Sequence, residues 1–498
     1  MKELTIEEAQ QRLKTGKVSA KKLVKEFLRR IITIDKTGPR LNAVIELNPD
    51  ALQIAEQLDR ERKAGNVRGP LHGIPIMIKD NINTADRMMT TAGSLALVGH
   101  YPEEDAFVVQ QLRKAGAIII GKTNLSEWAN FRSTRSTSGW SSRGGLTKNP
   151  YILDRSACGS SSGSAVAAAA NLCVAAVGTE TDGSIICPAQ TNGIVGIKPT
   201  LGLVSRTGII PIAHSQDTAG PMARTVKDAA ILLEVISGSD EEDTITTQQK
   251  KSAIIENEQL FEEGAIERMR IGVARNFFGF NRRGDKLMEQ AMKTLEQLGA
   301  EIIDEANIET TQDFREEEYL VLLYEMKNDM KAYLEKYGEK LPYKTLKDLI
   351  DFNEREKERV MPYFGQEHFL AAEEKGSLEE EEYLKALKKS KELAGKKGID
   401  AALKKHRVEA LIAPSGGPAW TIDLLNGDKF SGGSSSPAAV ASYPNITVPM
   451  GEIFDLPVGL SIMSSAYKEE TIIKIAYAFE QATKARKKPS YKKTLVLR

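Results

Sequence analysis

The order of hydrophobic and polar residues divides the chain into stretches of different character. Over residues 1–65 the apolar residues recur at helical spacing, and Thr5 with Glu8 has the form of a helix capping box. Over residues 66–310, short apolar runs alternate with amphipathic ones. Because alternating strands and helices bury their apolar faces against each other in layers, this stretch predicts an α/β core.

Individual runs predict the strands and helices of this core. Strand-like runs cover residues 74–78, 117–121, 172–177 and 270–274. Helix-like runs cover residues 104–114, 164–170, 226–236 and 285–298. The two kinds of run alternate from residue 74 to residue 298, which favours the α/β assignment.

The second half of the chain changes character. Residues 311–407 are rich in charge and lack the alternation, so they predict a helical insert that packs on the rim of the core. Residues 408–498 are expected to rejoin the core. Their strand-like runs are 410–414 and 445–449, and their helix-like run is 469–483. Because strands return after the insert, we expect residues 1–498 to form a single domain.

Composition narrows the partners and the location of the protein. Lys plus Arg and Asp plus Glu number 68 each, so the zero net charge gives no footprint for nucleic acid or an anionic membrane. No window approaches the roughly 18 uncharged apolar residues of a membrane span. Residues 1–8 show no apolar signal-peptide core. We therefore expect a cytoplasmic protein without nucleic-acid or membrane partners, and we favour a monomer.

Histidines and cysteines offer no metal site. The five histidines lack a spacing such as His-x-x-x-His, so we expect no metal and no other cofactor. Cys158, Cys173 and Cys187 are an odd, sparse set that does not predict a disulfide framework and fits a reducing compartment. Cys158 and Cys187 flank the candidate chemistry. We interpret them as inert packing residues rather than thiol nucleophiles, since no positive partner is evident.

Two serine-containing turns carry the candidate chemistry. Gly159 to Ser164 reads Gly-Ser-Ser-Ser-Gly-Ser and leads into an alanine-rich helix-like run, which a flexible linker would not do. Thr181 to Ile185 reads Thr-Asp-Gly-Ser-Ile and follows an apolar strand-like run. Such a turn can present the Ser184 hydroxyl and aim backbone N–H groups at one point, as an oxyanion hole requires.

The serine needs a base, and Lys79 is the candidate. It stands at the end of the apolar run 74–78, where a lysine would emerge from a buried strand. Lowering a lysine pKa from about 10.4 towards 7 requires roughly 4 kcal/mol from desolvation and the local surroundings. A Ser-His-Asp triad built on a Gly-x-Ser-x-Gly nucleophile elbow is not favoured.

These three pieces, in this order, resemble the amidase signature family. Ser160 and Ser184 are 24 residues apart (184 − 160), which is the spacing in that family. The resemblance runs from residue 65 to 225 and continues through 413–414 and 445–451. It implies an α/β fold with a large mixed β-sheet that is flanked by helices on both faces.

The resemblance also implies a role for each residue. Ser184 would be the acylated nucleophile and Lys79 the terminal base and acid. Ser160 would bridge them, joined to Gly159 by a cis peptide bond. The implied reaction cleaves a carboxamide to acid and ammonia through an acyl-enzyme. The implied oxyanion hole consists of backbone N–H groups of Thr181, Asp182, Gly183 and Ser184.

Within the family, the sequence is similar to the bacterial peptide amidases, which remove the C-terminal amide of peptide amides. The tRNA-dependent amidotransferase has, in its amidase-type subunit, glycines where Ser162 and Asp182 stand, and an arginine where Ile186 stands. These departures count against that subunit but leave it open, together with amidases of other small aryl or alkyl amides. A binding protein that keeps the fold without chemistry is the third class, which the complete Lys79, Ser160 and Ser184 set disfavours.

Candidate substrate-binding residues lie near the two serine turns in the sequence or in later loops. For Trp128 and Phe131, a place in the hydrophobic core is the alternative. Ser161 is also expected to shape its own loop through local hydrogen bonds. The full candidate set is Trp128, Ala129, Phe131, Ser161 and Trp420.

Overall fold

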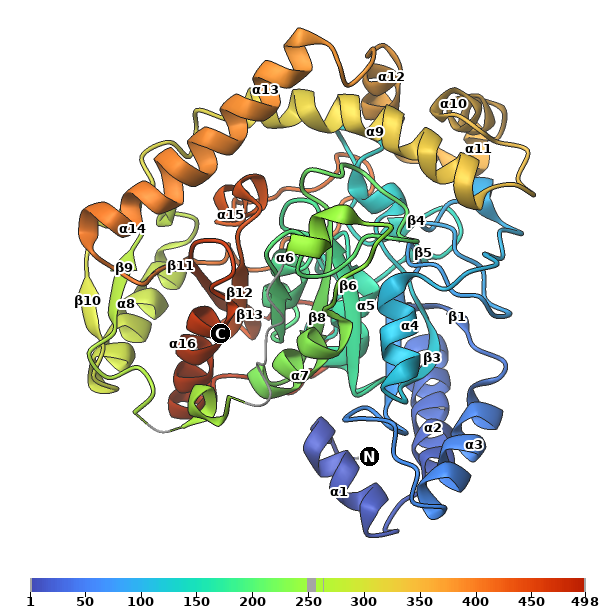
Figure 1. The fold of residues 1–498 in the computed structure, drawn as a ribbon, viewed down its shortest axis with the longest axis horizontal. Helices are drawn as coiled ribbons and strands as arrows, with labels where there is room; N and C mark the ends of the chain where they lie inside the picture. The colour runs from blue at the N-terminus through green and yellow to red at the C-terminus, as the bar shows by residue number, and fades with distance from the viewer. Residues whose placement is uncertain (1, 249–256, 263, 497–498) are drawn as a thin grey trace.

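The computed structural model describes residues 2–248, 257–262 and 264–496, and a large β-sheet forms its centre (Figure 1). The strands of this sheet are β1 (Val44–Leu47), β2 (Pro75–Lys79), β3 (Ile118–Thr123), β6 (Ala175–Glu180), β7 (Val195–Lys198), β8 (Thr218–Ala223), β9 (Arg270–Val273), β10 (Glu301–Ile303), β11 (Ala410–Pro414), β12 (Asn445–Ile453) and β13 (Leu456–Met463). Their spatial order is β1-β3-β2-β6-β8-β7-β12-β13-β11-β9-β10. The sheet is mixed, since β2 pairs in parallel with β3 and β6, whereas β8 is antiparallel to β6 and β7. A separate short ribbon is formed by β4 (Trp140–Ser141) and β5 (Gly145–Leu146).

Helices flank both faces of the sheet, which confirms the predicted fold class. Up to the end of the alternating region they are α1 (Ile6–Lys14), α2 (Ala20–Arg30), α3 (Ala51–Lys63), α4 (Phe107–Lys114), α5 (Ser162–Ala169), α6 (Ile186–Thr191), α7 (Val226–Ile236) and α8 (Arg282–Gln297). The remaining ones are α9 (Arg315–Tyr337), α10 (Leu346–Arg355), α11 (Lys357–Val360), α12 (Glu367–Glu373), α13 (Glu381–Lys391), α14 (Asp400–His406), α15 (Ser436–Ala441) and α16 (Glu469–Thr483). In the part of the chain that the structure describes, no helix is both long and apolar enough to cross a membrane.

Local sequence signals explain where several elements begin. The backbone N–H of Glu8 donates to the Thr5 hydroxyl, and the Thr5 N–H donates back to the Glu8 carboxylate, so the predicted capping box starts α1. Strand β6 begins at Ala175, three residues later than the run 172–177 predicts. Asn171 has a φ of 56° just after α5, and this left-handed turn keeps residues 172–174 in the connection.

The charged region forms helices between β10 and β11 in the chain order, as predicted. In Figure 1, α9 and α13 run along the top of the view, where they contact each other. Apolar side chains of this insert, such as Met326 and Phe369, share one buried cluster with Trp128 and Ile212 of the core. The insert therefore packs directly on the core, and a single domain over the whole chain stays a prediction.

Candidate active site

Lys79 ends β2 and is fully buried. Because β2 and β6 run parallel, with Ile78 opposite Val177, the carboxyl end of β2 lies beside that of β6. The Lys79 Nζ lies 2.7 Å from the Ser160 Oγ, 2.8 Å from the Thr179 Oγ1 and 3.2 Å from the Thr179 carbonyl oxygen. The predicted lysine and the predicted bridging serine are thus in direct contact.

Burial changes the acidity of this lysine. Desolvation lowers the pKa of Lys79 to about 7, although the charges of Asp217 and Glu180 act to raise it. Near neutral pH a large share of the molecules therefore carries a neutral amine at this position. Only a neutral amine has the lone pair that can accept a proton.

Ser160 lies just ahead of α5, and its side chain is fully buried. The peptide bond between Gly159 and Ser160 is cis, as the resemblance implies. The Ser126 N–H donates to the Ser160 carbonyl at 3.1 Å. A Cβ atom at Gly159 would stand 2.2 Å from the Ser126 Oγ, so a larger residue here would displace the hydroxyl that accepts the Gly139 N–H.

Ser184 ends the turn 181–184, between β6 and α6. Its residue surface is 8 % exposed, whereas Lys79 and Ser160 are fully covered. The Ser161 N–H donates to the Ser184 carbonyl at 3.1 Å, which holds the two serine loops against each other. Of the three predicted catalytic residues, Ser184 is therefore the one that retains some exposed surface.

Buried carboxylates hold both ends of this turn. The Glu180 carboxylate accepts the N–H groups of Ile185 and Ile186 at 2.7 and 2.9 Å. The Asp217 carboxylate accepts the Thr181 hydroxyl at 2.5 Å. Burial raises the pKa of Asp217 to about 6, against hydrogen bonds that act to lower it. Gly183 has a φ of 76°, a backbone conformation that favours glycine in the middle of the turn.

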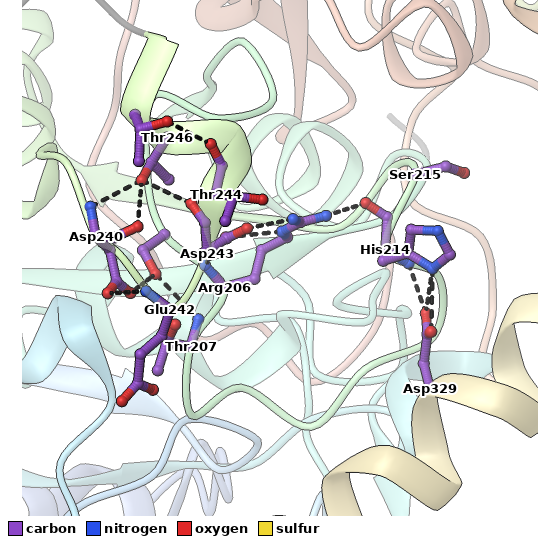
Figure 2. A network of polar contacts seen from close by, with 12 residues as sticks. Arg206, Thr207, His214, Ser215, Asp240, Glu242, Asp243, Thr244, Thr246 and Asp329 are labelled. Carbon is purple, nitrogen blue, oxygen red and sulfur yellow. Dashed lines mark hydrogen bonds and ion pairs between the residues drawn. The ribbon is translucent and has the colours of Figure 1, made fainter.

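The loop that carries Asp217 is tied to the core and to the helical insert (Figure 2). The Arg206 guanidinium pairs with the Asp243 carboxylate and also donates to the His214 carbonyl. The His214 ring lies 2.9 Å from the Asp329 carboxylate of α9. Burial alone would lower the pKa of His214, but the hydrogen bond and charge of Asp329 raise it. The insert is thereby linked, through this loop, to the turn 181–184.

Three side chains of the types that bind metal ions lie close together where this loop meets α9. In the described residues, His214, Glu325 and Asp329 bring ligand-type atoms within 4.8 Å of one another. Both carboxylates already have partners, because Asp329 accepts the His214 N–H and Glu325 accepts the Ser215 N–H and the Tyr383 hydroxyl. These contacts account for the cluster as the docking point of the insert, and we assign no ion to it.

The predicted aromatic substrate residues lie between the core and the insert. Trp128 is 2 % exposed, and its ring packs edge-on against Phe369 of α12, with centroids 5.6 Å apart. Phe131 stacks on His368 of the same helix at 4.7 Å. Both contacts favour the core alternative. A substrate role for Trp128 and Phe131 stays a prediction.

The other three candidates are placed differently. The buried Ser161 hydroxyl donates to the Thr179 carbonyl and accepts the Thr179 N–H, which fits the alternative that it shapes its loop. Ala129 lines a small cavity together with Thr179 and Asp217. The half-buried Trp420 donates its indole N–H to the Asp428 carboxylate at 3.0 Å. Their roles also stay predictions.

Several residues of the site are absent from the sequence prediction. Thr179 supplies two of the three contacts of the Lys79 amine, and Asp217 anchors Thr181. Thr179 is an ordinary strand residue with no local signal. Asp217 lies in the run Ser215-Gln216-Asp217-Thr218, which is part of the resemblance but carries no spacing rule of its own.

The interpretation of the cysteines is wrong. Cys158 and Cys187 form a disulfide bond, with Cα atoms 6.0 Å apart, and only Cys173 stays free and buried. A 29-residue separation in the sequence gave no hint that α6 folds back against the loop ahead of Ser160. The bond joins a residue two before Ser160 to a residue three after Ser184. Because disulfides are rare in reducing compartments, the cysteines no longer support a cytoplasmic location.

We expect this disulfide to stabilise the fold measurably. For a loop of this length, the chain-entropy model gives about 3.5 kcal/mol of stabilisation. The double variant Cys158→Ser/Cys187→Ser should therefore unfold at lower urea concentration than the wild type, with a loss of about 2–4 kcal/mol. Adding a reductant should bring the wild type to the same midpoint and leave the variant unchanged. Equal midpoints for the oxidised wild type and the variant would contradict the expectation.

Comparison with known proteins identifies the family. The model of the family described as Amidase matches residues 22–473. A probable amidase of Arabidopsis thaliana is 40 % identical, over 99 % of this chain and 92 % of its own length. The native peptide amidase of Stenotrophomonas maltophilia superposes with a TM-score of 0.93 at 48 % identity, covering 98 % of this chain and 99 % of that one. A glutamyl-tRNA(Gln) amidotransferase subunit of Carboxydothermus hydrogenoformans is 34 % identical, over 97 % and 98 % of the two chains.

The chain belongs to the amidase family, an outcome that confirms the resemblance seen in its sequence. It is an amidohydrolase that acts on amides. Among solved structures, its fold is similar to that of peptide amidase over nearly the whole length of both chains.

Proposed function

We propose that this amidase cleaves the C-terminal amide of peptide amides to peptide acid and ammonia, with Ser184 as nucleophile, Ser160 as proton bridge and Lys79 as base. One observation carries the catalytic assignment. The buried Lys79 amine, with its pKa lowered to about 7, lies 2.7 Å from the Ser160 hydroxyl, on a loop that is bonded to Ser184.

The contacts of the lysine fit a neutral amine. A neutral amine has two N–H donors and one lone pair. The Thr179 carbonyl oxygen and the Thr179 Oγ1 can take the two donors, at 3.2 and 2.8 Å. The lone pair is then left to accept the Ser160 hydroxyl proton. Ser160 can in turn accept a proton from Ser184 and so activate it.

The proposed reaction has two halves. In the first, Lys79 takes the Ser160 proton as Ser160 takes that of Ser184, and the Ser184 oxygen bonds to the amide carbon. Backbone N–H groups of residues 181–184 stabilise the oxyanion. The lysinium returns its proton through Ser160 to the nitrogen, the C–N bond breaks, and ammonia leaves. In the second half, a water molecule gives one proton to the same relay and its oxygen bonds to the acyl carbon. The bond from that carbon to the Ser184 oxygen then breaks, the proton returns through Ser160 to Ser184, and the acid leaves.

The proposed substrate class rests on similarity to a peptide amidase and on the residues in and next to the two serine-containing turns. The relative with the TM-score of 0.93 is called a peptide amidase, and Ser162, Asp182 and Ile186 differ from the amidotransferase pattern. An amidotransferase subunit is the second candidate, because relatives with that name are 34 % identical over nearly the whole chain. Amidases of other small amides are the third.

Ammonia release separates these candidates. The purified chain alone, without tRNA or ATP, should release ammonia from a blocked peptide amide, in amounts equal to the peptide acid formed. The same peptide as free acid is the blank. Aryl amides, glutamine and asparagine should react at least tenfold more slowly. Glutamine as the preferred substrate, or activity that requires partner chains, would contradict the peptide-amide assignment.

Two further expectations concern the oligomeric state and the location of the protein. A monomer stays a prediction. A cytoplasmic location also stays a prediction, and the Cys158–Cys187 disulfide counts against it.

A further inference from the structure

A second glycine- and serine-rich run, 432–436, lies against the turn 181–184. The Ser435 hydroxyl donates to the Asp182 Oδ1 and the Ser436 hydroxyl donates to the Asp182 Oδ2, both at 2.6 Å. The two serines are more than 250 residues away from Asp182 in the chain. The sequence between them includes the whole helical insert. We call these three residues the Asp182 clamp.

The geometry of the clamp fixes the carboxylate at two points. Each of its oxygens accepts one hydroxyl, at a length typical of strong O–H···O⁻ hydrogen bonds. The clamp is closely packed, because a Cβ atom at Gly183 would stand 3.0 Å from the Ser435 Oγ. The Asp182 side chain therefore has little freedom, and the backbone beside it is held against the run 432–436.

The other supports of the turn act at its ends. Asp217 holds Thr181 at the start, and Glu180 holds the N–H groups that follow Ser184. The Asp182 clamp acts at the middle of the turn, on Asp182 and beside Gly183, whose backbone N–H groups belong to the proposed oxyanion hole. Since donors of an oxyanion hole must be aimed before the reaction, the middle of the turn is the part whose orientation matters most.

Because Asp182 is negatively charged and has acidic neighbours, its carboxylate depends on the hydrogen bonds from the Ser435 and Ser436 hydroxyls. Burial raises the pKa of Glu318 on α9 to about 8, and the negative charge of Asp182 adds to that rise. The same charge contributes to the raised pKa of Glu180. The Asp182 carboxylate thus has acidic neighbours, and the hydroxyls of Ser435 and Ser436 provide the donors that stabilise it there.

We propose that Ser435 and Ser436 are positioning residues for catalysis: by clamping Asp182 they hold the backbone N–H groups of residues 181–184 in the orientation that stabilises the oxyanion. The inference rests on the proposed role of that turn. It adds a contribution from a distant segment that no motif around Ser160 or Ser184 contains. The run 432–436 then acts on the transition state and leaves substrate binding largely unaffected.

The test compares kcat, KM and the inhibition constant of a peptide aldehyde, whose adduct with a serine places an oxyanion in the hole. In Ser435→Ala/Ser436→Ala, we expect kcat to fall by about 10- to 100-fold, which is less than the roughly 100- to 1000-fold loss on removing an oxyanion donor itself, because the donors remain but are less well aimed. The aldehyde inhibition constant should rise by a similar factor, with KM changed less than threefold. The single variants should show intermediate losses, and Ser436→Thr, which keeps a hydroxyl, should recover most of the activity.

Ser434→Ala is the matched control in the same run. Its hydroxyl donates to the Pro414 carbonyl at 2.9 Å and does not contact Asp182. It should change kcat less than threefold. A double variant with wild-type kcat and wild-type aldehyde inhibition would overturn the inference, and so would an equal loss of kcat in Ser434→Ala. Failure of the proposed function is distinguishable, because the wild type itself would then release no ammonia and bind no aldehyde at Ser184.

Discussion

Ser184→Ala should abolish amide hydrolysis, with kcat lower by about six orders of magnitude, as for the loss of the nucleophile in a serine protease. The physical reason is that no other hydroxyl of the proposed relay can take over. Ser160 is fully buried and bonded to Lys79, whereas Ser184 keeps 8 % of its residue surface exposed. The measurement is the rate of ammonia release from a peptide amide at saturating and at low concentration.

The fold should survive this substitution. The Ser184 backbone keeps its bond to the Ser161 N–H, and the disulfide still ties α6 to the loop ahead of Ser160. The urea midpoint of Ser184→Ala should therefore match that of the wild type. Ser164→Ala is a control for removing a nearby buried hydroxyl, since that side chain bonds Thr123 and the Val177 carbonyl and not Lys79. More than about 1 % residual activity in pure Ser184→Ala would contradict the assignment.

Lys79→Met should lower kcat/KM by about four orders of magnitude, at the upper end of what general acid–base catalysis contributes. Methionine retains much of the apolar stem and removes the amine that accepts the proton. The sign of the pH dependence follows from the lowered pKa of about 7. Below that pH the amine is protonated and cannot act as a base, so wild-type kcat/KM should fall about tenfold per pH unit. Above it, activity should reach a plateau.

Lys122 offers a matched control for Lys79. It is also fully buried and lies on the neighbouring strand β3, opposite Ile78 and one residue before the register partner of Lys79. Burial lowers its pKa to about 8. Its amine, however, bonds the Ile82 carbonyl and the Thr90 hydroxyl. Folded Lys122→Met should therefore keep kcat/KM within tenfold of the wild type and retain the same acidic limb. If Lys79→Met keeps near-normal activity at neutral pH, the lysine is not the base.

Much of the fold could be predicted from the sequence, because many of its strands and helices each correspond to one continuous apolar or amphipathic run. The runs 226–236, 410–414 and 469–483 coincide with α7, β11 and α16. Strand β8 was not predicted, since its sequence Thr-Ala-Gly-Pro-Met-Ala has weak strand propensity and contains a proline. The glycine of this strand is explained by a close approach between strands, because a Cβ atom at Gly220 would stand 2.1 Å from the Ile197 carbonyl oxygen on a nearby strand.

The residues of the site also include some that could be predicted from the sequence and some that could not. Lys79 and Ser160 were predictable because each sits in a recognisable run, and the structure brings them into contact. Thr179 and the clamp serines were not, because their roles arise from strands and loops that meet only in the folded chain. The disulfide was missed for the same reason. Local sequence defines the reacting groups, and the tertiary fold supplies the contacts that tune and aim them.

The site of covalent labelling tests the central claim most directly. A fluorophosphonate reacts with an activated serine, and peptide mass spectrometry locates the adduct. The account predicts one equivalent of label on Ser184, loss of labelling in Ser184→Ala, and slow labelling in Lys79→Met and below pH 6. Labelling on another residue, such as Ser160 or Ser161, or unchanged labelling of Ser184→Ala, would contradict it.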